Sequence, residues 1–370
     1  MNLEALVPEY VRAFQAYTPS RPDHLLMREY GTAHLFRLNN NENPLGPPPA
    51  AAQVIAAFPP AQAAVYPSGD AWDLRAALGR RLGICADRLL VGNGSCEVIA
   101  SVIKAFCEPG DNIVTADKTF AVYEWVAEFS GIEARLTPLR HHAFDPQAML
   151  ERIDRRTKIL FVCNPNNPTG TFWTRPMLVD FLEKVGEDKI VVVDEAYCEY
   201  VEDPLYPDAI SLMARFPNLV AFRTFSKMYA LAGLRTGYLA GSEAVTAVVR
   251  RTSVAYSVNV QAQQAAVAAL ADDAAHIAHT RALVKEARSF LCRACDDLGL
   301  ETVCGEGNYL MIRVPINDML MYRRLMKQGM MVRSMTGFRY PGWIRVTLRE
   351  MAVMERFAAA LEQEIRALRG

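Results

Sequence analysis

The stretch KIVVVDEAY, residues Lys189–Tyr197, places a carboxylate directly after a run of branched apolar residues. Such a run predicts a strand that is buried on both faces, as the strands of a parallel sheet are. A carboxylate at the end of a buried strand is costly unless a cation or several hydrogen-bond donors meet it. Asp194 is therefore expected either to cap a helix or to face a positive group such as a protonated ring nitrogen.

Apolar runs of the same kind alternate with helical patterns from Asp87 to about Gly241. This alternation predicts repeated strand–helix units and a mainly parallel sheet in one large α/β domain, residues 41–260. The expected strands are residues 112–116, 134–138, 158–163, 190–193, 219–223 and 235–240. The expected helices between them include residues 97–106, 120–129 and 175–184.

The two flanking parts of the chain have a different texture. Residues 261–370 begin with an alanine-rich helical region, and this part predicts a smaller α+β domain. Its expected strands are residues 309–313 and 344–347, and its later helices are 316–327 and 351–368. Residues 1–40 have little core of their own, so we expect this arm to pack on the small domain or on a partner subunit.

The composition favours a small-molecule substrate. Forty basic and 41 acidic residues leave a formal charge of -1, so no overall field attracts nucleic acid or an anionic membrane. No apolar run approaches the roughly 20 residues of a membrane span, and the first residues lack a signal pattern, so we expect a cytoplasmic protein. The eight cysteines are expected as reduced thiols, with no metal site; Cys292 and Cys295 have the spacing of a helix and indicate packing.

A glycine-containing turn, GNGSCE at residues Gly92–Glu97, leads directly into an expected helix. The free N–H groups of such a helix start can hold an anion, although a plain tight turn with Ser95 as N-cap remains open. The turn lacks the third glycine of a dinucleotide-binding fingerprint, because Glu97 stands there. This departure argues against a nicotinamide oxidoreductase.

A lysine follows another expected strand in the stretch TFSKMYALAGLRTGY, residues Thr224–Tyr238. If Lys227 is buried, it tends to lose its proton, and a neutral amine can attack a carbonyl group. If its stem instead extends to solvent, it is an ordinary surface charge. The turn NPNNPTG, residues Asn164–Gly170, adds carboxamide groups after a third strand.

Eight motifs in order resemble the fold-type I, pyridoxal-phosphate-dependent aminotransferases, most closely their histidinol-phosphate aminotransferase branch. They are NNNENPLGP, VYPSG, GNGSCE, KTFAVY, NPNNPTG, VVVDEAY, TFSKMYALAGLRTGY and WIRVTLR. The resemblance implies a seven-stranded sheet, pyridoxal 5'-phosphate as cofactor, and a homodimer with shared active sites. It also implies amino transfer between histidinol phosphate, or an aromatic or other amino acid, and a 2-oxo acid such as 2-oxoglutarate.

The resemblance assigns roles to individual residues. Lys227 would be the Schiff-base lysine and proton shuttle. Asp194 would hold the pyridine nitrogen protonated, Tyr197 and Asn167 would bind the ring hydroxyl oxygen, and Tyr123 would stack on the ring. The cofactor phosphate would be held by Ser95, Cys96, Thr224, Ser226 and Arg235, and by Tyr66 of the neighbouring subunit. The substrate would be bound by Arg345, and Arg333, Tyr17 and Asn43 would lie near the same pocket.

Several departures from the branch pattern lie around the expected substrate. Cys96 stands where aspartate is usual, Lys118 precedes Thr119 where proline is typical, and Arg349 follows where a glycine is often near. They leave open a pyridoxal-phosphate-dependent lyase, decarboxylase or cyclase as the alternative reaction. A non-catalytic regulator of this fold usually carries a DNA-binding domain, for which there is no room before residue 40.

Overall fold

The computed structural model describes residues 2–15, 21–271 and 273–369. Its larger sheet has seven strands, and all of them except β8 run in one direction. In spatial order they are β2 (Leu89–Gly92), β8 (Gly237–Ala240), β7 (Leu219–Thr224), β6 (Ile190–Asp194), β5 (Thr157–Cys163), β3 (Asn112–Ala116) and β4 (Glu133–Thr137). The predicted mainly parallel sheet is confirmed.

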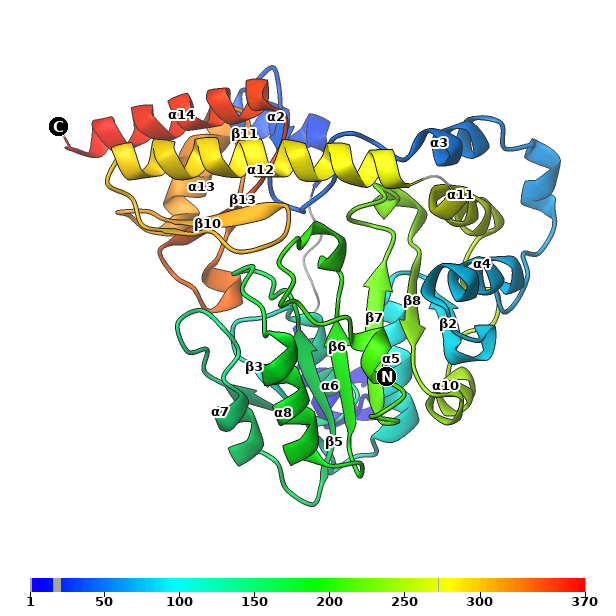
Figure 1. The fold of residues 1–370 in the computed structure, drawn as a ribbon. Helices are drawn as coiled ribbons and strands as arrows, with labels where there is room; N and C mark the ends of the chain where they lie inside the picture. Colours follow the sequence, from blue (N-terminus) through cyan, green and yellow to red (C-terminus); the bar gives the residue numbers. More distant parts are fainter. Residues whose placement is uncertain (1, 16–20, 272, 370) are drawn as a thin grey trace.

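Helices flank this sheet (Figure 1). Nearly every residue of β5, β6 and β7 is buried. Because successive residues of a strand point to opposite faces of the sheet, both faces are covered, and this explains the continuous apolar runs in the sequence. The helices of this part are α3 (Pro49–Ala56), α4 (Trp72–Leu82), α5 (Ser95–Phe106), α6 (Val122–Phe129), α7 (Pro146–Glu151), α8 (Arg175–Val185), α9 (Ala209–Leu212), α10 (Glu243–Arg250) and α11 (Val260–Ala271).

A smaller antiparallel sheet lies in the C-terminal part of the chain. Its order is β12 (Arg333–Ser334), β13 (Trp343–Thr347), β10 (Tyr309–Arg313) and β9 (Thr302–Val303). Three helices accompany it: α12 (Ala274–Asp297), α13 (Asp318–Lys327) and α14 (Met351–Arg369). Figure 1 shows α12 and α14 side by side along one edge of the molecule, and they pack against each other.

The N-terminal segment joins this smaller sheet region. Strand β1 (Phe36–Arg37) pairs in parallel with β11 (Met330–Met331). Ahead of it come the short helices α1 (Glu9–Arg12) and α2 (Asp23–Tyr30). Leu26 of α2 is buried in a cluster with Met326 and Met331, whereas α1 contacts α6. The segment therefore spans both parts of the fold.

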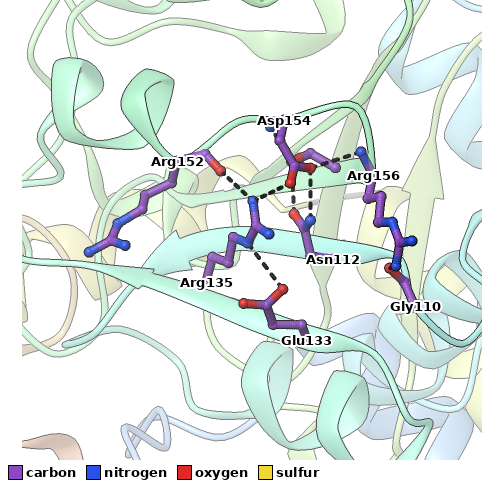
Figure 2. Close-up of polar contacts among 8 residues, drawn as sticks. Gly110, Asn112, Glu133, Arg135, Arg152, Asp154 and Arg156 are labelled. Carbon is purple, nitrogen blue, oxygen red and sulfur yellow. Dashed lines mark hydrogen bonds and ion pairs between the residues drawn. The ribbon is translucent and has the colours of Figure 1, made fainter.

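A polar network joins the amino ends of β3, β4 and β5, at the sheet edge opposite their carboxyl ends (Figure 2). Asp154 is its centre: Oδ1 accepts hydrogen bonds from Asn112 Nδ2 at 3.0 Å and from the backbone N–H of Arg156 at 2.8 Å. Its Oδ2 lies 2.8 Å from Nη1 of Arg135. These contacts hold the loop before β5 against the two neighbouring strands.

One pair of cysteines is not reduced, in contrast to the predicted free thiols. Cys292 and Cys304 form a disulfide, so reduced thiols are wrong for these two residues. The chain turns after α12 and returns through β9, which brings Cys304 beside the helix although it is 12 positions away. Cys295 is fully buried on α12, as predicted for a packing residue. Among the described residues, no helix is long and apolar enough to span a membrane, and no cluster of His, Cys, Asp or Glu forms a metal site.

Candidate functional site

A cavity of about 800 Å³ lies where the carboxyl ends of β5, β6 and β7 face the smaller sheet. Carboxyl ends of parallel strands share one edge, so residues far apart in the chain meet there. The structure brings together most of the residues predicted for the site. Those that line the cavity are Ser95, Cys96, Asn167, Asp194, Tyr197, Thr224, Ser226, Lys227, Arg235, Arg333 and Arg345.

Lys227 follows β7 and presents its amine to this cavity. Its Nζ donates a 2.8 Å hydrogen bond to the backbone carbonyl of Asn40. Burial, followed by the nearby charge of Arg345, lowers the pKa of Lys227 to about 8. A considerable fraction of the amine is therefore neutral near physiological pH, as a nucleophile or a proton acceptor requires.

Asp194 ends β6 and is only 3% exposed. Its Oδ2 accepts a 2.5 Å hydrogen bond from the hydroxyl group of Tyr123, and its Oδ1 accepts from the N–H of Ala196 at 3.1 Å. Burial raises the pKa of Asp194, whereas these two donors and the charge of Lys227 act in the opposite direction. The carboxylate caps no long helix; it lines the cavity and can face a cationic ring nitrogen.

Arg345, on β13, forms the side of the cavity that the smaller sheet contributes. Its Nη1 donates to Oδ1 of Asn167 at 2.5 Å, and its Nη2 donates to the backbone carbonyl of Asn39 at 2.6 Å. Its Nε is buried without a hydrogen-bond partner among the described residues. Burial lowers the pKa of Arg345 to about 10, so the guanidinium stays charged near neutrality and can bind an anion.

Tyr197 and Asn167 lie on the cavity wall as predicted partners of a ring oxygen. The hydroxyl group of Tyr197 accepts a 2.9 Å hydrogen bond from Nδ2 of Asn41, which leaves its own proton free for donation. Burial raises the pKa of Tyr197 to about 12, so this hydroxyl is protonated at neutral pH.

The start of α5 forms the other end of the cavity. Ser95 is the first residue of this helix, and Gly94 before it has a φ of 77°. A Cβ at Gly94 would collide with the guanidinium of Arg235, so glycine allows the arginine to lie against the helix start. Arg235 Nη1 contacts the hydroxyl of Ser226 at 3.5 Å. Free helix N–H groups, hydroxyls and a guanidinium together fit a phosphate group.

Tyr123 lies outside the set of cavity-lining residues. Its ring does not line the cavity: it is fully buried and stacks on Phe161, with ring centroids 4.7 Å apart. Tyr123 is in the first turn of α6, and its stacking on a cofactor ring stays a prediction. Phe120, just before this helix, lines the cavity.

Of the three other predicted residues, two lie outside the cavity and one lies outside the described residues. Asn43 is buried outside it, where its Nδ2 donates to the carbonyl of Met228 at 2.8 Å. Tyr66 is 83% exposed, and its ring lies 5.1 Å from that of Tyr256. Tyr17 lies outside the described residues.

The sequence reasoning also missed residues that line the cavity. Within the motif NNNENPLGP, the prediction names Asn43, whereas Asn39, Asn40 and Asn41 form the wall. Phe120 is in the motif KTFAVY, which the sequence did place at the site, whereas nothing in the sequence indicated the segments of the other aromatic and arm residues. The missed residues are Phe14, Gln15, Phe120, Trp125 and Phe338.

Comparisons with known proteins agree with this geometry. Residues 33–361 match the family model described as aminotransferase class I and II. The chain is 38% identical over 362 residues to a histidinol-phosphate aminotransferase of Anaeromyxobacter, covering 96% of this chain and 98% of the relative. It is 40% identical over 352 residues to one of Symbiobacterium thermophilum, covering 95% and 96%.

Solved structures share the fold over nearly the whole chain. The histidinol-phosphate aminotransferase of Sinorhizobium meliloti, solved in complex with pyridoxal-5'-phosphate, superposes with a TM-score of 0.87 at 25% identity and covers 97% of both chains. A Thermus thermophilus aspartate aminotransferase double mutant has a TM-score of 0.82 at 23% identity, covering 97% of this chain and 99% of its own, which shows a shared fold.

Proposed function

Since the chain belongs to the family of class I and II aminotransferases, we propose that it transfers the amino group of histidinol phosphate to a 2-oxo acid such as 2-oxoglutarate. Amino-group transfer with pyridoxal phosphate is the activity of the protein. The identity of the donor is the proposed part. It is supported by the names of the relatives and by the anion-binding groups of the cavity.

Pyridoxal phosphate, when bound, supplies an electron sink that makes the proton on the amino-bearing carbon of the substrate removable. We assign Lys227 to hold the cofactor covalently and then to accept and return that proton, for which its lowered pKa suits it. Asp194 keeps the ring nitrogen protonated, and Tyr197 with Asn167 binds the ring oxygen. Arg235, Thr224, Ser226 and the start of α5 hold the phosphate.

The observation that carries the donor proposal is the pair of arginines beyond the cofactor-holding groups. Arg345 and Arg333 line the same cavity, on the adjacent strands β13 and β12. A guanidinium binds phosphate or carboxylate equally well through its two parallel N–H groups. A phosphorylated amino donor and a dicarboxylic acceptor can therefore use the same arginines in the two halves of the reaction.

We also propose a homodimer in which Tyr66 reaches the phosphate site of the partner subunit. The support is that Tyr66 is exposed and outside the cavity of its own chain, next to the exposed side chains of Val65 and Tyr256. Mixing Lys227→Ala chains with Tyr66→Ala chains tests this proposal, because each hybrid dimer regains one complete site. A mixture no more active than its components contradicts shared sites.

The cytoplasm remains the predicted compartment.

The donor is tested with purified, cofactor-loaded protein and 2-oxoglutarate as acceptor. Glutamate formation is measured with histidinol phosphate, histidine, an aromatic amino acid and an unrelated phosphorylated amine. We expect the highest kcat/KM with histidinol phosphate and a large loss when the phosphate is absent. Equal rates with histidine would contradict the proposed donor, without affecting the assignment of the protein as an aminotransferase.

A further inference from the structure

Arg339 occupies a backbone conformation that favours glycine. Its φ is 58°, in the left-handed region, directly after the turn Thr336–Phe338. A side chain at such a position costs free energy that glycine avoids, so a compensating interaction of the side chain is expected. The guanidinium of Arg339 makes that interaction with Glu124, through Nη2 to Oε1 at 2.5 Å and Nη1 to Oε2 at 2.8 Å.

This ion pair connects the two walls of the cavity. Arg339 belongs to the segment between β12 and β13, whereas Glu124 is on α6 beside the larger sheet. Nη1 of Arg339 also donates to the backbone carbonyl of Asp117 at 3.2 Å, at the start of the loop that carries Phe120. Glu124 is only 12% exposed at its side chain, so the pair is partly shielded from solvent.

The residue before Arg339 lies against both proposed substrate arginines. The ring centroid of Phe338 is 5.7 Å from Cζ of Arg333 and 5.7 Å from Cζ of Arg345. A ring face at this distance attracts a guanidinium and restricts its orientation. Because Phe338 and Gly337 line the cavity, a shift of their backbone would move the ring away from the anion-binding groups.

We propose that the Arg339–Glu124 pair is a positioning device for the substrate side of the cavity. By fixing residue 339 against α6, it holds Phe338 against the two guanidiniums and so determines how tightly anionic substrates bind. The inference rests on the proposed function in so far as Arg333 and Arg345 bind substrate anions. Arg339 and Glu124 themselves contact neither the substrate nor the cofactor in this assignment.

Arg339→Gly is the most informative variant, because glycine accepts the left-handed conformation while the ion pair is lost. We expect KM for 2-oxoglutarate and for the amino donor to rise about five- to tenfold, with kcat within about twofold. The melting temperature should change little, because the relief of backbone strain offsets the loss of the pair. A merely structural role would instead lower the melting temperature and leave KM unchanged.

Glu124→Ala and the double variant Arg339→Gly with Glu124→Ala test whether the two residues act together. We expect each single change and the double change to raise KM by the same factor. The matched control is Glu301→Ala, which breaks the exposed Arg313–Glu301 pair in the smaller sheet and should leave KM unchanged. Independent, multiplying effects of the two single changes would overturn the proposal, as would a KM unaffected by either.

Calorimetric binding of 2-oxoglutarate and of inorganic phosphate to the cofactor-loaded protein gives a readout that needs no turnover. We expect the Kd of at least one of these anions to rise in Arg339→Gly by the factor seen in KM. If histidinol phosphate is not a donor but Kd still rises, only the proposed donor is wrong. If the unmodified protein binds neither anion, the positioning role fails, since the arginines then have nothing to bind.

Discussion

The hydroxyl group of Tyr123 donates a 2.5 Å hydrogen bond to Oδ2 of Asp194, behind the wall of the cavity. Tyr123 is itself fixed by full burial and by its stacking on Phe161. A donor to one carboxylate oxygen stabilises the charged form, which burial alone would disfavour. Tyr123 thus opposes the cost of burying the carboxylate that we assign to the ring nitrogen of the cofactor.

Replacing Tyr123 with phenylalanine should raise the pKa of Asp194, because a hydrogen bond that favours its charged form is lost. The affinity of the apoprotein for pyridoxal phosphate should therefore begin to fall at a higher pH than in the unmodified protein as pH is lowered. Titration of cofactor binding against pH measures this shift. Tyr200→Phe is the control, because the buried hydroxyl of Tyr200 has no partner among the described residues. An equal shift in both variants would contradict the specific effect.

Covalent uptake of pyridoxal phosphate should follow the ionisation of Lys227. The pKa of this lysine is lowered to about 8, so its reactive neutral form is scarce well below pH 8 and predominates above it. The rate of uptake by the apoprotein should rise with pH with a midpoint near that value. Uptake is measured by mass after borohydride reduction. Lys227→Ala should abolish it, whereas Lys184→Ala, at an exposed position on α8, should not. A midpoint near the ordinary lysine pKa would contradict the buried amine.

Arg345→Lys should weaken the use of anionic substrates while the charge is kept. Lysine cannot reproduce the fork that contacts Asn167 and Asn39, and it offers no two parallel donors to an anion. We expect kcat/KM for 2-oxoglutarate to fall about 10- to 100-fold, as for the loss of a charged hydrogen bond. Arg349→Lys is the matched control, since Arg349 pairs with Glu350 and does not line the cavity. Equal losses in the two variants would show a general effect of arginine replacement.

The sequence predicted the strand ends well, because a buried strand followed by a polar residue has a pattern visible along the chain. Asp194 and Lys227 were found in this way, and the shared edge of a parallel sheet explains why they meet. The sequence could not predict which aromatic residue near the start of α6 lines the cavity. Phe120 and Tyr123 are three positions apart, and of these two only Phe120 is a lining residue. The distinction depends on where the helix begins, which is the least reliable feature of such a pattern.

Contacts between residues that are far apart in the chain could not be predicted from the sequence either. Glu124 and Arg339 are 215 positions apart, and neither lies in one of the motifs by which the family resemblance was recognised. Asn41 and Tyr197 do lie in two of these motifs, but their hydrogen bond across 156 positions was not predicted either. A sequence pattern with periods of two or 3.6 residues describes one element at a time. The pairing of elements from different sheets therefore needed the structure.

Asp154 offers a test of the fold away from the cavity. Hydrogen bonds from Asn112 and Arg156, and the ion pair with Arg135, lower the pKa of this carboxyl group (Figure 2). A group with a lowered pKa in the folded state contributes stability that is present above its unfolded pKa and is lost as pH falls through its folded pKa. Asp154→Asn should therefore destabilise the protein at neutral pH, and the difference from the unmodified protein should shrink in acid.

Urea unfolding of the two proteins between pH 7 and strongly acidic conditions measures this difference in the free energy of unfolding. Asp296→Asn on α12 serves as the control, because the carboxylate of Asp296 makes no hydrogen bond or ion pair with other described residues. The cavity is at the opposite edge of the sheet, so the kcat of folded Asp154→Asn protein should stay near that of the unmodified protein. A destabilisation that did not change with pH would mean that packing around Asp154, and not its charge, holds the loop before β5.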